Sequence, residues 1–229
     1  MTPTCDELIA RLRAMGTPEN VAGQQRFAIR GGEQLGVSVT DIRRLARGIH
    51  DHELAQQLWN SGIHEAQILA ALVDEPAKVT LEQMESWVSQ FESWDICDET
   101  TDELFIHTAY CEQVIPLWAT REDEFVRRAA FAMIAALSIH RKDLPDVKVK
   151  SYFPLIEAAA GDERNFVKKA VNWALRNLGK FRPGLRADAV ACAKRILLQS
   201  SKSARWIASD ALKEFETKFG SDYVAAIKG

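Results

Sequence analysis

The chain has 229 residues, of which 47% are hydrophobic and 27% are charged, as in ordinary globular proteins. The N-terminal residues lack the basic and apolar regions of a secretory signal. The longest apolar run, residues 129–137, is far shorter than the roughly 18 residues that a membrane helix needs. We therefore expect a soluble, cytoplasmic protein with no membrane partner.

The net charge of −3 conceals an asymmetry between the two halves of the chain. Residues 1–120 hold 8 Lys and Arg against 19 Asp and Glu, whereas residues 121–229 hold 21 against 13. A basic C-terminal half predicts a surface for a polyanion. The cysteines are scattered and show no metal-binding spacing, so we expect buried thiols, no metal site and no organic cofactor.

Helix signals recur from end to end, and strand signals are nearly absent. Thr4 and Thr80 begin stretches with capping-box spacing, and Thr17 precedes a proline that suits a first helical turn. Short connections between the predicted helices favour one all-α domain over residues 1–229. The predicted helices cover residues 4–15, 18–30, 39–49, 51–61, 63–74, 81–91, 93–109, 111–119, 122–139, 147–160, 163–179, 185–199, 203–217 and 221–228.

The C-terminal half contains an internal repeat. Residues 124–130 align with residues 165–171 at an offset of 41, and residues 170–175 align more loosely with 207–212 at an offset of 37. Periods near 40 with two helices per unit are typical of HEAT-type repeats. We therefore expect an α-solenoid, whose concave face is a common binding surface. Because many scaffold proteins share this architecture, the repeats alone do not choose a function.

Two groups of residues are candidates for a site. In the stretch Ser93-Trp94-Asp95-Ile96-Cys97-Asp98, Trp94 and Asp98 are four residues apart, so an indole and a carboxylate share one helix face. The structural alternative is a core tryptophan beside a surface acid. Farther on, a helical stripe combines one ring with three cations at Lys169, Trp173, Arg176 and Lys180, and Arg128 is the repeat equivalent of Lys169.

If these faces line the concave side, they form a cationic groove that contains Trp94, Asp98 and Trp173. The alternative is a solvated basic face with Trp173 half-buried under lysine stems. Arg176 is a candidate for a phosphate contact or for a salt bridge to Glu163 or Asp162, and its spacing does not decide between them.

Along most of its length the chain resembles the AlkD-like DNA alkylation repair family, the alkylpurine DNA glycosylases built of HEAT-like repeats. The Trp-Asp-x-x-Asp motif at residues 94–98 and the later Trp173 are the most specific features of the likeness. Unlike many members, the chain has Ser93 rather than a second tryptophan before Trp94. The resemblance is carried by residues 35–39 with 42–43, 58–65, 93–98, 125–128 and 172–176.

The resemblance implies a bacterial enzyme that releases cationic alkylated purines from duplex DNA. By similarity, Asp98 is the catalytic carboxylate, Trp94 and Trp173 face the lesion, and Arg128 binds the substrate. We assign weaker DNA-backbone contacts to Arg176, Lys169 and Lys180. The partner is duplex DNA containing alkylated purines, bound by a monomer without cofactors, and the protein is nucleoid-associated when bound.

Two other functions are compatible with the same residues, since the family includes members with weak or no excision activity. The first is a non-catalytic protein that recognises damaged or branched DNA, which release of free base would distinguish from an enzyme. The second is a protein-interaction scaffold. In a scaffold, charge reversal at Lys169 would leave DNA affinity near background in both variant and parent.

Overall fold

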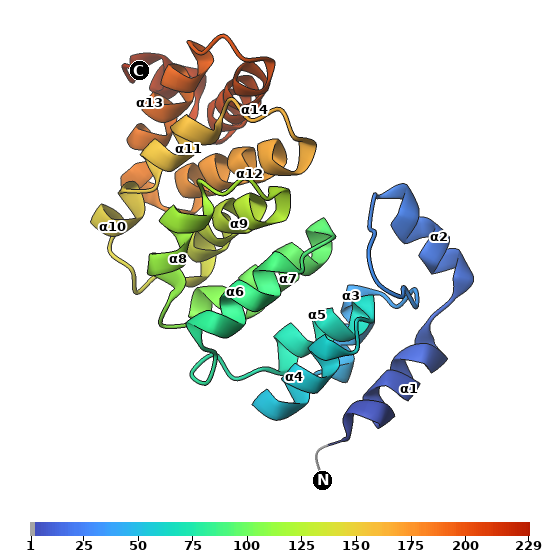
Figure 1. Ribbon diagram of the computed structural model, residues 1–229. Coiled ribbons are helices and arrows are strands. Elements are labelled where there is room, and N and C mark those ends of the chain that lie inside the picture. Colours follow the sequence, from blue (N-terminus) through green and yellow to red (C-terminus); the bar gives the residue numbers. More distant parts are fainter. Residues whose placement is uncertain (1–2) are drawn as a thin grey trace. The chain divides into compact units, whose positions relative to one another are not determined.

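The computed structural model describes residues 3–229, which fall into two compact units with a boundary between Tyr110 and Cys111 (Figure 1). Within the described residues, regular structure is helical, apart from an isolated bridge between Glu33 and Ile63. No helix in this part of the chain is long and apolar enough to cross a membrane. The all-α prediction is thus confirmed, whereas the single-domain prediction stays a prediction.

The N-terminal unit is built of short helices, several of which begin at the predicted caps. Thr4 and Glu7 form a complete capping box. The side chains of Thr17 and Thr80 also accept hydrogen bonds from the first turns of their helices. The elements of this unit are α1 (Cys5–Met15), α2 (Pro18–Arg26), α3 (Val39–Leu45), α4 (His52–Asn60), α5 (His64–Val73), α6 (Leu81–Ser89), α7 (Trp94–Glu103) and the short 3₁₀ helix η1 (Phe105–His107).

The C-terminal unit has three long helices packed side by side, with α12 between α9 and α14 (Figure 1). Helix α8 packs on α9, and α13 packs on both α12 and α14, which gives the predicted stacking of helix pairs. The elements are α8 (Cys111–Trp118), α9 (Glu124–His140), α10 (Asp146–Lys150), α11 (Phe153–Ala159), α12 (Asn165–Phe181), η2 (Pro183–Leu185), α13 (Arg186–Leu197), α14 (Lys202–Phe219) and α15 (Ser221–Ala226).

Contacts between neighbouring long helices follow the repeat found in the sequence. Phe125 and Phe166, which are equivalent at the offset of 41, pack with ring centroids 5.3 Å apart and ring planes tilted by 33°. Asn177 of α12 donates a hydrogen bond to the Ala135 carbonyl of α9, again about one repeat earlier. Equivalent positions therefore pack against each other, as expected when each unit buries its apolar face on the next.

Several predicted helices end early or divide, and the one predicted over 39–49 ends at Leu45. The helix predicted over 147–160 is two helices, α10 and α11, because Pro154 has no N–H to donate to the carbonyl four residues earlier. The helix predicted over 18–30 ends at Arg26, and Ala28 then adopts a positive φ of 58°. The helix predicted over 93–109 divides at Leu104, where α7 gives way to η1.

The cysteines form no disulfide within residues 3–229, and three of the four are buried. Burial raises the pKa of the Cys111 and Cys192 thiols to about 12. Because thiolates are the reactive form, these two side chains are inert packing groups at neutral pH.

Candidate functional site

Trp94 and Asp98 lie one turn apart at the start of α7, and both side chains are half-buried. The helical spacing therefore puts the indole and the carboxylate on one face, as predicted from the sequence. The pair combines a partly exposed aromatic surface with a negative charge, which suits a cationic ligand.

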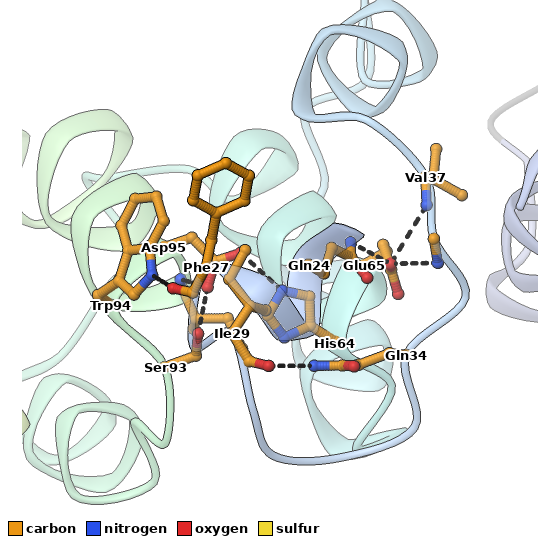
Figure 2. A network of polar contacts seen from close by, with 12 residues as sticks. Gln24, Phe27, Ile29, Gln34, Val37, His64, Glu65, Ser93, Trp94 and Asp95 are labelled. Atoms are coloured by element: carbon orange, nitrogen blue, oxygen red, sulfur yellow. Dashed lines mark hydrogen bonds and ion pairs between the residues drawn. The ribbon is translucent and has the colours of Figure 1, made fainter. Parts of the chain in front are cut away.

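The first turn of α7 is fixed by a buried polar network (Figure 2). The Asp95 carboxylate lies 2.8 Å from His64 Nε2 and accepts hydrogen bonds from the Ser93 hydroxyl and the Ile96 N–H. On the outer side, the Trp94 indole N–H donates to the Phe27 carbonyl at 2.9 Å. Both sides of the turn that carries Trp94 are thus held in place.

Asp95 is charged at neutral pH in spite of its burial. Burial acts to raise the pKa of Asp95, but the hydrogen bond and charge of His64, together with the Ser93 hydroxyl and Ile96 N–H, outweigh it. The pKa of Asp95 therefore lies below its ordinary value. The two acids of the motif have different surroundings: Asp95 faces the buried network, and Asp98 remains half-buried one turn farther on.

Glu65, the next residue after His64, holds the loop before α3. Its fully buried carboxylate accepts hydrogen bonds from the backbone N–H groups of Leu35 at 2.9 Å, Gly36 at 2.7 Å and Val37 at 3.3 Å. The side-chain amide of Gln24 adds a fourth at 3.0 Å. Our sequence interpretation assigned no role to His64 or Glu65. The feature of the sequence that could have identified them is that two ionisable residues begin the mostly apolar helix α5.

The predicted cationic stripe lies on α12, but its four residues differ in their contacts. Lys169 is exposed, and no described residue pairs with it. Trp173 is half-buried. Arg176 donates to Asp210 at 3.1 Å and to Glu214, and Lys180 pairs with Glu214 at 3.1 Å. The stripe exists, but α14 neutralises its C-terminal half.

The salt-bridge partners considered for Arg176 in the sequence were therefore wrong. Asp162 instead binds Arg127 at 2.9 Å and Arg164 at 2.6 Å, while the Glu163 carboxylate accepts from Ser201 and Ser203 at the start of α14. Burial acts to raise the pKa of Asp162, but the hydrogen bonds from Arg164 and Arg127 bring it down to about 2.

Arg128 is buried, with 6% of its surface exposed. Its guanidinium donates to the Phe166 carbonyl at the start of α12, at 2.7 Å. This contact links the N-terminal turns of α9 and α12. A role for Arg128 in binding substrate stays a prediction, and in this structure the side chain supports packing. One groove containing Trp94, Asp98 and Trp173 also stays a prediction, because these residues belong to different units.

A seam of polar pairs between α12 and α14 was missed in the sequence. Asn172 donates to Asp210 at 2.7 Å, next to the contacts made by Arg176. One turn earlier, the Lys168 ammonium lies 5.4 Å from the centre of the Trp206 ring. The partners in these pairs are 34 to 38 residues apart. Spacing within one helix could not reveal them.

Comparisons with known proteins agree with this architecture. A solved structure described as "a new family of proteins related to the HEAT-like repeat DNA glycosylases with affinity for branched DNA structures" superposes with a TM-score of 0.78. The two chains are 18% identical, and the match covers 95% of this chain and 97% of the other, which shows a HEAT-like helical fold. A search of curated proteins gives no match. The model of the family "DNA alkylation repair enzyme" matches residues 8–215, and the chain therefore belongs to that family.

Proposed function

We propose that this protein is a DNA glycosylase that hydrolyses the N-glycosidic bond of cationic N3- or N7-alkylated purines in duplex DNA. The observation that carries the proposal is the half-buried pair Trp94 and Asp98, held on a helix turn that a buried network fixes. Membership of the DNA alkylation repair enzyme family supports it. Rigid support of this kind is what catalytic groups need, since small displacements are costly in rate.

The proposed chemistry needs a carboxylate rather than a strong acid. An alkylated purine is already cationic, so its C1′–N bond breaks with the electron pair leaving on a neutral base. Asp98 then stabilises the cationic sugar and orients the water that adds to C1′ and loses a proton. At about 4 Å and an effective dielectric near 20, opposite unit charges attract by roughly 4 kcal/mol. That attraction corresponds to about a thousandfold in rate.

Release of free 7-methylguanine and 3-methyladenine from methylated duplex DNA tests the proposal. We expect release by the wild type under single-turnover conditions and its loss in Asp98→Asn, with an unchanged circular dichroism spectrum. Trp94→Phe is a milder variant, which should retain part of the activity because a smaller ring still faces the cation. Equal rates in wild type and Asp98→Asn would remove Asp98 from its assigned role.

The second candidate function is binding of damaged or branched DNA without excision. It is favoured by the affinity for branched DNA of the structurally similar family. It predicts salt-sensitive binding with no release of free base. Binding to a four-way junction that exceeds binding to the matching linear duplex, with no base release from either, would establish it over the first.

A further inference from the structure

We infer that α12 and α14 carry a site for an unpaired DNA strand, centred on Trp206. The inference rests on the proposed association with DNA but not on excision. We call this site the Trp206 patch, and it consists of Lys168, Lys169, Lys202, Arg205 and Trp206. It lies at the N-terminal ends of the two helices, within the C-terminal unit.

Trp206 is an exposed aromatic side chain in a cationic setting. It keeps 43% of its surface accessible, although a tryptophan on a long packed helix would normally be buried. The Lys168 ammonium lies 5.4 Å from its ring centre, and Lys202 is one turn earlier on the same face of α14. An accessible ring beside two ammonium groups matches what single-strand binding proteins present to a base and its phosphates.

The repeat places this tryptophan at a position where its neighbours carry cations. The offset of 37 aligns Trp206 with Lys169, which in turn is equivalent to Arg128 at the offset of 41. Arg128 is buried and Lys169 is exposed, so accessibility changes along the series. The last member is the aromatic one, which gives the end of the repeat array a different surface from its middle.

The charges of α12 and α14 divide the surface into two parts. Toward the C-terminal end, Asp210 and Glu214 pair with Arg176 and Lys180. Toward the N-terminal end, Lys169 and Lys202 are exposed and have no ion-pair partner among the described residues. Glu163, an acid near this end, accepts hydrogen bonds from Ser201 and from the Ser203 N–H, and its charge also attracts Lys168 and Lys202. The four cations of the patch outnumber this acid, so the patch keeps a net positive charge that phosphates can neutralise.

An unpaired strand fits this surface better than a continuous duplex does. Inside a continuous duplex, both faces of each base are covered by stacking, so that only phosphates are available to the patch. An unpaired base offers its face to Trp206 while its phosphates reach the lysines. We therefore expect the patch to add affinity where a duplex continues into a single strand, as at an overhang or a branch.

The test uses the full chain and three fluorescent DNAs that share one duplex: a blunt end, a thymidine overhang, and an overhang of the same length made of abasic sites. We expect Trp206→Ala to weaken binding to the thymidine overhang roughly tenfold, within the range measured for stacking of one base on an aromatic ring. Binding to the other two DNAs should stay near the wild-type value. Trp206→Phe, which keeps a ring, should retain most of the affinity.

Charge variants test the lysines separately. Lys168→Gln and Lys202→Gln should each reduce the slope of log affinity against log salt by about 0.7 to 0.9, one phosphate contact each. Lys218→Gln removes the same charge about 24 Å farther along α14, at a rise of 1.5 Å per residue, and should leave the slope near the wild-type value. Thermal unfolding of every variant checks that each remains folded.

The inference is overturned if Trp206→Ala binds the thymidine overhang as the wild type does, or if the wild type binds thymidine and abasic overhangs equally. It is also overturned if Lys218→Gln changes the slope as much as Lys202→Gln. Base release from blunt methylated duplex is measured in parallel. Absence of release with a Trp206-dependent preference for the overhang would remove the glycosylase proposal alone, and release without that preference would remove this inference alone.

Discussion

Asp95 and Asp98 are three residues apart and have separate tasks. Asp95 accepts hydrogen bonds inside a buried network with His64, whereas Asp98 lies half-buried on the face that carries Trp94. A buried hydrogen-bonding group that loses its partner lowers the stability of the folded protein by about 1–3 kcal/mol. We therefore expect Asp95→Ala to lower the free energy of unfolding by that amount, measured by urea denaturation. Asp98→Asn, which keeps the shape of the side chain, should change stability little.

The different roles of Asp95 and Asp98 can be tested directly by experiment. If Asp98→Asn unfolds as readily as Asp95→Ala, then Asp98 is a structural residue and the catalytic assignment loses its basis. Excision should depend mainly on Asp98, whereas stability should depend mainly on Asp95. We expect excision to be lost in Asp98→Asn and partly retained in Asp95→Asn. Asp95→Asn leaves an amide that can still hydrogen-bond His64.

Asp162 should make the protein sensitive to acid. Its pKa is about 2 in the folded protein, below the ordinary value of 3.8, because Arg164 and Arg127 outweigh the effect of burial. A lowered pKa stabilises the folded state above the ordinary value, and that stabilisation disappears as the pH falls from about 4 toward 2. We expect the free energy of unfolding of Asp162→Asn to depend less steeply on pH in this window. A parallel pH dependence in variant and wild type would contradict the assignment.

At the scale of elements, one carboxylate of α5 orders a loop that has no regular structure of its own. Three backbone N–H groups of the loop before α3 point to Glu65, and Gly36 among them has a positive φ of 80°. Each hydrogen bond to a charged group contributes at most about 1.5–3 kcal/mol to the free energy of unfolding. We expect Glu65→Gln to lower stability by about 2 kcal/mol and to speed amide hydrogen exchange at Gly36.

Glu53→Gln is the matched control for that change, since Glu53 is exposed on the neighbouring helix α4. It removes the same charge and should leave both stability and exchange near the wild-type values. Protection at Gly36 that survives Glu65→Gln would show that the loop is ordered by its other contacts.

Helix positions could be predicted from the sequence because caps and apolar spacing act locally. Thr4 and Thr17 bond to the first turns of their helices, as their positions indicated. The break before Pro154 was missed, although a missing N–H is a local feature. The acids that neutralise Arg176 and Lys180 are on the next long helix, and only tertiary packing brings them there. Sequence reasoning therefore identified the cationic stripe but not its partners.

At the scale of the whole molecule, the basic C-terminal half does not present all its charge to a ligand. Asp210 and Glu214 hold Arg176 and Lys180 along the seam between α12 and α14. Burial acts to raise the pKa of Glu214, but Arg176 and Lys180 outweigh it and lower the pKa below its ordinary value. Glu214 is thus charged at neutral pH and competes with any phosphate for the same cations.

Replacing both acids should therefore strengthen DNA binding while weakening the fold. In Asp210→Asn with Glu214→Gln, two negative charges disappear and Arg176 and Lys180 become available to phosphates. We expect the slope of log affinity against log salt to become steeper by up to about 0.9 for each further phosphate that the protein neutralises. We also expect a lower melting temperature, because the ion pairs of the seam are lost. Asp222→Asn, an exposed acid on α15, is the control for net charge. If it raises DNA affinity as much per charge as the double variant does, the seam has no specific role and only net charge governs binding.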